Sequence, residues 1–294
     1  MRIKRLLDDV MEIDLGRVRL GSERVICLTS DRHHDSMFSL SELELKHLEI
    51  AKKQSAIILD FGDIFDAMQT KGDPRANYAL LKDKYRCAAY LDELVNGAIE
   101  RYKPYANNFA MLALGNHEAT ILDKLGTNLS ARLAQGLGEH VQAMPYAGWV
   151  AIKARTPNHR LHKVNIYYNH GSSNGGLMSF GTLDVRRMAS YLQDADIIVQ
   201  GHTHDCYVLP LAREKLCDGK VERSVGWHVR TPSYLDDFAS RGWAARTGKP
   251  PRVHGCIDKT ACAHAILLCA QPCHHKVSRV PAEAHSNHVC GPAQ

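Results

Sequence analysis

Short apolar runs alternate with longer amphipathic segments along most of the chain, which is the pattern of an α/β fold. Runs rich in β-branched and apolar residues predict strands at 24–30, 56–61, 109–114, 149–155, 163–169 and 195–200. Two later segments, 205–213 and 220–230, predict a hairpin. We therefore expect a sheet-based fold with helices between its strands.

Four segments carry helical periodicity. They are 41–54, about 75–103, about 118–135 and 182–193. Ser41 and Glu44 have the spacing of a capping box at the start of the first helix. The second is expected to stop at Pro104, because proline removes a helical hydrogen bond.

Composition limits the classes of protein to which the chain can belong. Its 294 residues, 45% of them hydrophobic, suffice for one substantial core. The net charge of +5 is modest and both signs are interspersed, so charge alone does not predict nucleic-acid binding. No signal peptide is visible, and no apolar run approaches the about 20 residues that cross a bilayer. We expect a cytoplasmic protein with no membrane partner, and the oligomeric state stays open.

The last forty or so residues differ in texture from the rest, with crowded cysteines and histidines and little periodicity. We predict one domain over 1–255 and a poorly ordered Cys/His-rich tail over 256–294. Five of the nine cysteines lie there: Cys256, Cys262, Cys269, Cys273 and Cys290. Their spacing contains no Cys-x2-Cys pair, which disfavours a structural zinc site.

Metal-competent side chains recur directly after the predicted strands. They are Asp31 and His33, Asp63 and Asp66, Asn116 and His117, His170, and His202 and His204. The carboxyl ends of strands in an α/β sheet converge on one edge, where ligand sites lie in the loops. Gly62, Gly115 and Gly201 precede three of these groups and permit tight turns. Segments far apart in sequence are thus predicted to meet at one point.

The residue types fit divalent cations. Imidazole suits zinc, iron, manganese or nickel, and carboxylate suits the harder of these ions. Two ions about 3.5–4 Å apart can hold a hydroxide and clamp a phosphoryl group during in-line attack. Each motif alone has a simpler explanation, since Asp31 and His33 resemble a capped turn and GDIFD is a common turn composition. GNHE and GHTH are more distinctive, and the complete ordered set predicts a two-ion centre.

In this order the motifs resemble those of the calcineurin-like metallophosphoesterase superfamily: D-x-H, GD-x-x-D, GNH-[DE], a lone His and GH-x-H. The resemblance spans about residues 25–205. Segments such as 187–205 are similar to phage and prophage members, which extends the likeness to about residue 253. The resemblance implies a four-layer αββα sandwich with the site at the strand ends.

The resemblance also implies a role for each residue. The first ion would be held by Asp31, His33, Asp63 and His204, and the second by Asp63 as a bridge with Asn116, His170 and His202. His117 would face the scissile phosphate and Asp66 would orient it. Manganese is the first expectation for both ions, with iron, zinc or nickel as alternatives. The adjacent His34 leaves open which histidine ligates, although the spacing favours His33.

We therefore expect a dinuclear phosphoester hydrolase, a phosphodiesterase or nuclease in which a metal-bridged hydroxide attacks phosphorus. Ala67 and Met68 stand where the serine/threonine protein phosphatases have Arg-Gly, which argues against that class. The alternatives are a phosphomonoesterase of a small substrate, a non-catalytic scaffold and a nucleic-acid-binding module. The loop 171–181 can cradle a phosphate or be a plain loop, and the basic segment 241–252 can hold nucleic acid or be solvated.

Overall fold

The computed structural model describes residues 1–19, 22–69, 73, 76, 78–172, 181–238, 244, 248 and 251–256, and the strands at 264–269 and 276–279. Most of the loop 171–181, most of the segment 241–252 and most of the tail lie outside these residues. The expectations about phosphate cradling, nucleic-acid contact and order of the tail therefore stay predictions.

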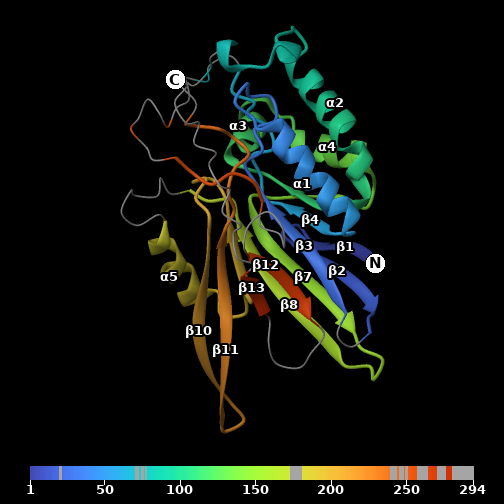
Figure 1. The fold of residues 1–294 in the computed structure, drawn as a ribbon, viewed down its shortest axis with the longest axis vertical. Coiled ribbons are helices and arrows are strands. Elements are labelled where there is room, and N and C mark those ends of the chain that lie inside the picture. The colour runs from blue at the N-terminus through green and yellow to red at the C-terminus, as the bar shows by residue number, and fades with distance from the viewer. Residues whose placement is uncertain are drawn as a thin grey trace, which may run out of the picture.

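Two β-sheets pack face to face (Figure 1). One has seven strands in the order β1-β2-β7-β8-β9-β11-β10. These are β1 Arg2–Leu7, β2 Val10–Arg17, β7 Ala147–Arg155, β8 Leu161–Asn169, β9 Ile197–Gln200, β11 Lys220–Arg230 and β10 Tyr207–Cys217. The other has six strands in the order β13-β12-β3-β4-β5-β6. These are β13 Lys276–Arg279, β12 His264–Cys269, β3 Glu23–Thr29, β4 Ile57–Asp60, β5 Phe109–Ala113 and β6 Gln142–Met144.

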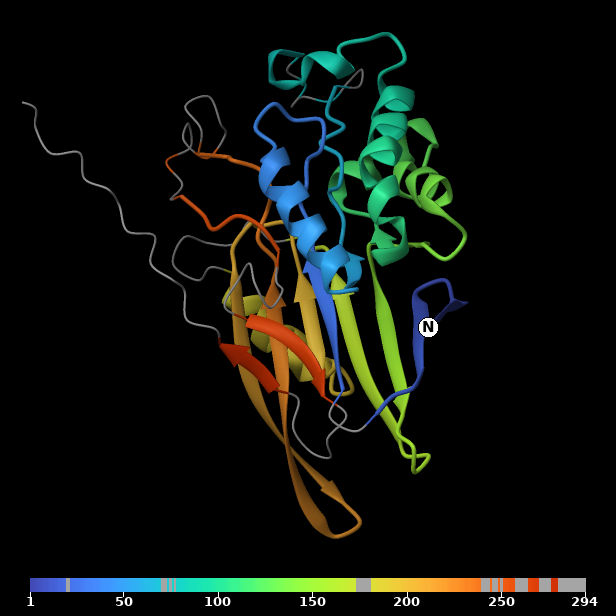
Figure 2. The same cartoon turned by 45° about the vertical axis from the view of Figure 1, so that its right-hand side comes forward.

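Helices cover both outer faces. Four cover the six-stranded sheet and its upper end: α1 Ser41–Lys53, α2 Tyr90–Tyr102, α3 Asn116–Leu125 and α4 Leu129–Leu137 (Figures 1 and 2). The helix α5, Thr182–Tyr191, covers the seven-stranded sheet. Among the described helices, none has the length and apolar content needed to cross a bilayer.

Alternation along the strands divides the core into layers. In β3, Ile26 and Leu28 point between the sheets, whereas Cys27 points toward the helices. The neighbouring strand β4 repeats the pattern, with Leu59 between the sheets and Ile58 under the helices. The expected αββα sandwich is confirmed.

Two helix predictions were wrong in extent. The expected helix over 75–103 is α-helical only from Tyr90, and short 3-10 helices occupy Tyr78–Leu80 and Asp83–Tyr85 before it. The expected helix over 118–135 is two helices, because Gly126 ends α3 in a left-handed conformation with φ of 70°.

The capping box predicted at Ser41 was also wrong. Ser41 is the first residue of α1, Leu40 precedes it, and no side chain caps the helix. Glu44 is instead buried, 1% exposed, and accepts hydrogen bonds from Arg32 Nη1 at 2.7 Å and Arg101 Nε at 2.8 Å. The carboxylate is used for tertiary charge pairing rather than for capping.

Arg32 is a buried charge at the end of β3, between Asp31 and His33. Its Nε lies 2.6 Å from Asp60 Oδ2, and its Nη1 reaches Glu44. Burial opposes the charge on Arg32, but Asp60 and Glu44 outweigh it and raise the pKa of Arg32. The guanidinium therefore ties β3, β4 and α1 together behind the strand ends.

Removing this guanidinium should destabilise the fold strongly. Arg32→Leu leaves the carboxylates of Asp60 and Glu44 buried without their main cation, which typically costs about 3–5 kcal/mol. Arg132→Leu removes an exposed pair with Asp92 and should cost less than about 1 kcal/mol. Urea unfolding of the metal-free proteins measures both, and equal losses would contradict the assigned role of Arg32.

His228 should make the protein sensitive to acid. It lies buried in β11, 3.0 Å from Gln200 Oε1, and burial together with the nearby Arg230 lowers its pKa to about 3. Below pH 6.5 His228 therefore binds a proton in the unfolded chain but not in the folded chain, so the free energy of unfolding falls as the pH falls. From pH 7 to pH 5 this histidine should cost about 2 kcal/mol.

The test compares the free energy of unfolding at pH 7 and pH 5 in wild type and His228→Gln. The variant should lose less stability over this interval, whereas the exposed control His159→Gln should behave as wild type. An unchanged pH dependence in His228→Gln would contradict the assignment.

Candidate metal centre

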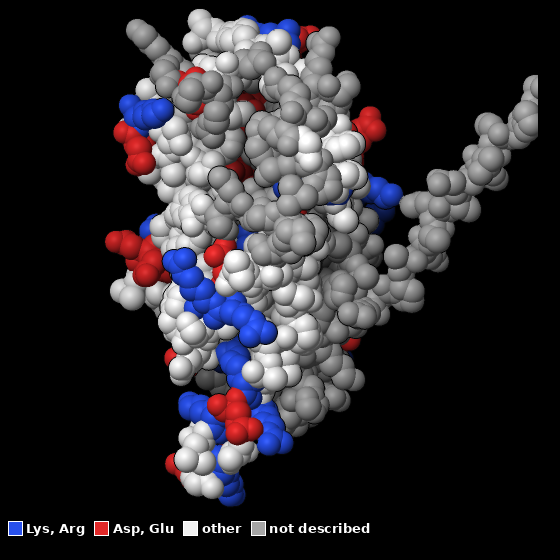
Figure 3. Space-filling model, turned by 90° about the vertical axis from the view of Figure 1, so that its left-hand side faces the viewer, with Lys and Arg blue, Asp and Glu red and all other residues white. Residues whose placement is uncertain are grey.

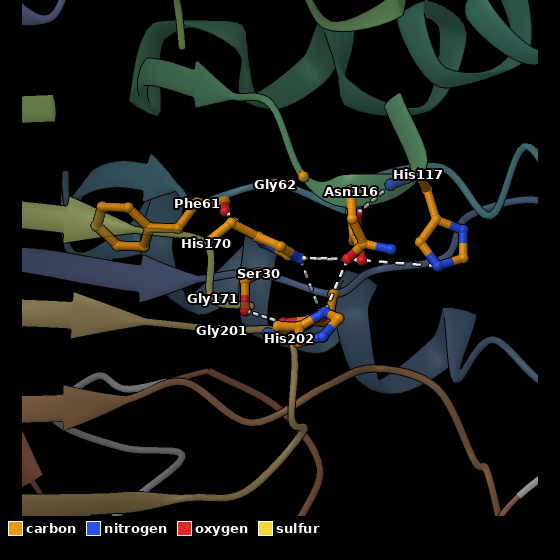
Figure 4. A network of polar contacts seen from close by, with 12 residues as sticks. Ser30, Phe61, Gly62, Asn116, His117, His170, Gly171, Gly201 and His202 are labelled. Carbon is orange, nitrogen blue, oxygen red and sulfur yellow. Dashed lines mark hydrogen bonds and ion pairs between the residues drawn. The ribbon is translucent and has the colours of Figure 1, made fainter. Parts of the chain in front are cut away.

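Side chains from both sheets meet above the carboxyl ends of five strands. β3, β4 and β5 deliver Asp31, Asp63 and Asn116 from the six-stranded sheet, and β8 and β9 deliver His170 and His202 from the other. Figure 4 shows His170, Asn116 and His202 pointing toward one another from separate elements. The predicted convergence of distant segments is present.

The first group of potential ligands is Asp31, His33 and His204, whose ligand atoms all lie within 4.8 Å of one another. His204 Nε2 is 3.3 Å from Asp31 Oδ1 and 3.4 Å from His33 Nε2. The neighbouring His34 hydrogen-bonds Tyr85 OH at 2.7 Å instead. Of the two adjacent histidines, His33 is therefore the one at this group.

The second group is Asp63, His170 and His202, joined by Asn116. His170 Nε2 lies 3.0 Å from Asp63 Oδ2 and 3.2 Å from Asn116 Oδ1. The same amide oxygen is 2.7 Å from His202 Nδ1 (Figure 4). His170 Nε2 is also 4.0 Å from Asp31 Oδ1, so the two groups share a border.

His117 and Asp66 lie beside these groups, but their contact differs from the one expected. His117 Nδ1 contacts the main-chain carbonyl of Asp66 and is 3.8 Å from its carboxylate. That carboxylate is closer to His33, with 3.0 Å between Asp66 Oδ1 and His33 Nδ1. Asp66 thus holds His117 through its main chain and His33 through its side chain.

The backbone takes uncommon conformations at the strand ends. Positive φ values of 44–70° occur at Asp31, His33, Asp63, His202 and His204. Non-glycine residues rarely adopt this left-handed region, and such strain concentrates at functional sites. These five residues are therefore held in place by their surroundings rather than by local preference.

Close packing of the loops explains two of the glycines. A Cβ on Gly115 would lie 2.0 Å from Asp63 Oδ1, and a Cβ on Gly201 would lie 2.6 Å from Asp31 Oδ2. Both carboxylates accept main-chain hydrogen bonds from the opposite loop: His117 N donates to Asp63 at 3.0 Å, and His202 N donates to Asp31 at 3.0 Å. These two carboxylates, which are candidate metal ligands, thus fasten the loops to one another.

Glu118, which sequence reasoning did not assign to the site, fastens two of these loops. Its Oε2 accepts from Asp63 N and Gly115 N, both at 3.0 Å, and its Oε1 accepts from Phe65 N at 2.9 Å. Burial and the Asp63 charge raise the pKa of Glu118 to about 8, while the N–H donors act against that rise. The acidic fourth position of GNHE was the signal available in the sequence.

Charges within the centre balance one another. Burial opposes ionisation of Asp31, but His204 and His170 outweigh it and lower the pKa of Asp31. His170 and His117 likewise overcome burial at Asp63 and lower the pKa of that carboxyl well below its usual range. Burial lowers the pKa of His170, but Asp63 and Asp31 raise it to about 9. The carboxylates therefore create a strong preference for positive charge.

The orientation of the imidazoles fits a metal ion. His170 Nδ1 donates to the Phe61 carbonyl at 2.8 Å, so its Nε2 is the nitrogen that faces the oxygens of Asp63 and Asn116. A ring nitrogen that faces oxygen acceptors needs a cation between them, which is a proton on Nε2 or a metal ion in its place. The Nε2 atoms of His33 and His204 face each other 3.4 Å apart, and His204 Nε2 is 3.3 Å from Asp31 Oδ1, so a cation can also lie in the first group. The nitrogen and oxygen donors suit divalent transition metals.

Comparison with known proteins agrees with this chemistry. The calcineurin-like phosphoesterase family profile matches residues 25–206. The chain belongs to this family. It is accordingly a metal-dependent phosphoester hydrolase of a family that binds divalent metals, and the groups above are candidate ligands for them. No curated protein matches the chain significantly.

Several solved structures resemble this phosphoesterase at low sequence identity. A Streptococcus pneumoniae TIGR4 protein described as a predicted phosphoesterase is 13% identical, with a TM-score of 0.30, over 73% of this chain and 75% of that one. The calcineurin-like phosphoesterase YfkN of Bacillus subtilis is 13% identical, with a TM-score of 0.37, over 77% and 95%. A putative 5'-nucleotidase of Staphylococcus aureus is 12% identical, with a TM-score of 0.40, over 73% and 49%.

Glu118→Gln should loosen this phosphoesterase's metal centre. Above pH 8, where Glu118 is ionised, the substitution turns one acceptor oxygen into an NH₂ group that faces main-chain N–H donors, so at least one buried hydrogen bond is lost, at about 1–3 kcal/mol. Urea unfolding and Mn²⁺ titration of the variant measure the effect. The exposed control Glu139→Gln should match wild type in both, and a Glu118→Gln variant that also matched it would contradict this role.

Proposed function

We propose that the chain is a two-metal phosphodiesterase that acts on nucleic acid. The observation that carries the proposal is the pair of bordering ligand groups, Asp31–His33–His204 and Asp63–His170–His202, with the His117 imidazole at their side. Two bound ions would supply Lewis-acid stabilisation of the phosphoryl group and activation of a water molecule. Manganese is the proposed metal.

Each ligand group would hold one ion. His33 and His204 would present their Nε2 atoms to the first, and His170 Nε2 and the Asn116 amide oxygen would serve the second. Asp63 is proposed to serve both ions, because its Oδ2 lies 3.0 Å from His170 of the second group and its charge also acts on His33 of the first. The 4.0 Å approach of His170 to Asp31 is compatible with neighbouring ions.

His117 is proposed to act on the leaving group. The Asp66 carbonyl accepts at His117 Nδ1, which leaves Nε2 free to exchange a proton with the departing oxygen. The side chain is 11% exposed, and its Nε2 is 3.7 Å from Asp63 Oδ2. It is thus a catalytic residue that lies at the metal groups without belonging to either proposed ligand set.

Charge favours a diester over a monoester. Ala67, which is buried, stands where related protein phosphatases have a phosphate-binding arginine. Among the described residues, three arginines near the centre are already bonded to protein groups: Arg32 to Asp60 and Glu44, Arg230 to the Gly201 carbonyl and Arg252 to the Thr203 carbonyl. A phosphodiester carries one negative charge and a monoester up to two, so the diester needs less positive charge from the protein.

Nucleic acid is the proposed diester class. Lys and Arg gather along the lower part of one face, toward the β10–β11 hairpin, with some acidic residues between them (Figure 3). Lys215, Lys220 and Arg223 are exposed there. Such residues would meet the phosphates of a long polyanion. The similarity to phage and prophage members favours a phage-derived enzyme of the host cytoplasm.

Hydrolysis assays with bis-p-nitrophenyl phosphate and p-nitrophenyl phosphate test the proposal. Metal-free protein should be inactive, and Mn²⁺ should restore hydrolysis chiefly of the diester. His117→Asn should lower kcat about 10²–10⁴-fold without loss of bound Mn²⁺, because the imidazole handles a proton rather than a metal. The exposed control His159→Asn should keep full activity.

Other outcomes lead to different functions. Hydrolysis of the monoester alone would make the chain a phosphomonoesterase. Mn²⁺ binding without hydrolysis of any phosphoester, nucleic acids included, would contradict the diesterase proposal. An unchanged kcat in His117→Asn would remove that residue from the mechanism.

A further inference from the structure

The segment that follows β11 forms a wall of the first ligand group. Tyr234 N and Ser233 Oγ both donate to the Asp31 carbonyl, each at 2.9 Å. Thr231 Oγ1 contacts Ser30 Oγ at 2.6 Å. This segment lies beyond residues 25–206, the part of the chain that carries the family motifs. It nevertheless holds the backbone of Asp31 in its left-handed conformation.

Asp237 extends this wall to the imidazole of His204. Its Oδ2 lies 2.8 Å from His204 Nδ1, and the residue is buried, 7% exposed. Burial opposes its ionisation, but His204 outweighs burial and lowers the pKa of Asp237. The other oxygen, Oδ1, has no hydrogen-bond partner among the described residues. The principal polar contact of this buried carboxylate is therefore the histidine.

Arg252 fastens the same region from the other side. Its Nη1 donates to the Thr203 carbonyl and is 3.9 Å from Asp237 Oδ2, while its Nε is 3.8 Å from Asp205 Oδ1. Thr203 and Asp205 flank His204 in the chain. The loop that carries the ligand is thus held at both neighbours, and the imidazole itself is held by Asp237.

We propose that Asp237 is a positioning residue that aims His204 Nε2 at the first metal ion. A carboxylate that accepts from Nδ1 fixes the tautomer and ring orientation and makes Nε2 a stronger ligand. Asp66 supports His33 in the same way, at 3.0 Å. The inference rests on the proposed two-ion centre.

The two ion positions should consequently differ in strength. Both imidazoles of the first group are backed by carboxylates, from Asp66 and Asp237. In the second group, His170 is backed by a main-chain carbonyl, which is a weaker acceptor. The first position should therefore bind its ion more tightly, and loss of Asp237 should narrow that difference.

The test titrates the metal-free full-length chain with Mn²⁺ in a calorimeter. Equilibrium dialysis counts the Mn²⁺ ions that each chain binds. Asp237→Asn keeps the shape of the side chain but loses its charge. It should lower the affinity for one of the two ions about 10–100-fold and leave the affinity for the other within about 2-fold of wild type. Asp236→Asn is the matched control and should bind Mn²⁺ as wild type does, since within the described part of the chain its carboxylate accepts only from Phe238 N, at 3.2 Å.

Two further variants separate positioning from other roles. Asp237→Glu retains a carboxylate and should recover part of the affinity lost in Asp237→Asn. Excess Mn²⁺ should restore diester hydrolysis in Asp237→Asn but not in His204→Ala, which lacks the ligand itself. The visible spectrum of Co²⁺ in the first position should shift in Asp237→Asn and not in Asp236→Asn.

The proposal is overturned if Asp237→Asn binds both ions as tightly as wild type, or if it weakens both equally. If Asp237→Asn fails to fold, Asp237→Ser takes its place, because it also lacks a carboxylate, and unchanged Mn²⁺ affinity and Co²⁺ spectrum in that variant would overturn the proposal. A wild type that binds one ion contradicts the two-ion centre instead. In that case, a lower affinity for the single ion in Asp237→Asn would still support the role of Asp237, and an unchanged affinity would overturn that role.

Discussion

Two buried carboxylates, Asp31 and Asp63, have to stay ionised where the edges of the two sheets meet. Both are at most 1% exposed, and water does not stabilise their charge. Imidazoles and main-chain N–H groups from the opposite loops compensate for this loss, which lowers the pKa of both carboxyls. Much of the surrounding structure follows from the need to bring these partners within reach.

The scaffold meets this need with rigid supports behind the strand ends. Arg32 neutralises Asp60 and Glu44 one layer below the centre, so that additional buried charge there does not disturb the ligands. Glu118 fixes the turn that carries Asp63, and Asp35 accepts from the N–H groups of Asp66 and Ala67 at 2.6 and 3.1 Å. The loops at the centre are therefore as firmly bonded as the strands that carry them.

Local patterns were enough to predict β3, β4, β5, β7, β8, β9 and the β10–β11 hairpin, but not β6, β12 or β13. The N-terminal hairpin β1–β2 was not predicted, although Met11 and Ile13 alternate with acidic residues as an inner-face pattern requires. The strand β1 is almost entirely exposed and carries no such pattern. A strand at the exposed edge of a sheet buries few side chains, so its sequence lacks the alternation of apolar and polar residues by which strands are predicted.

Features that depend on distant partners escaped sequence reasoning. Glu44 has capping-box spacing, but its carboxylate forms ion pairs with two arginines outside its helix, Arg32 and Arg101. The segment 75–89 has helical periodicity, but its short 3-10 turns follow the loop around Asp35, to whose carbonyl Lys82 N donates. Asp237 is 33 residues beyond its partner His204, in a segment that looks like an ordinary turn. Motif spacing identifies the candidate ligands, and tertiary contacts identify the residues that hold those ligands in place.

The position of β9 in the chain has a consequence for biosynthesis. Both ligand groups include a histidine from the loop after β9, and the contact between His33 and His204 spans 171 residues. Until residue 204 has been made, a growing chain therefore carries Asp31, His33 and Asp63 without a complete candidate site for an ion. Contacts of such long range also slow folding, because the chain loses conformational entropy on closing the long loop before the contacts form to offset that loss. A metal ion at these groups would therefore bind only after the chain has extended past residue 204 and the two sheets have come together.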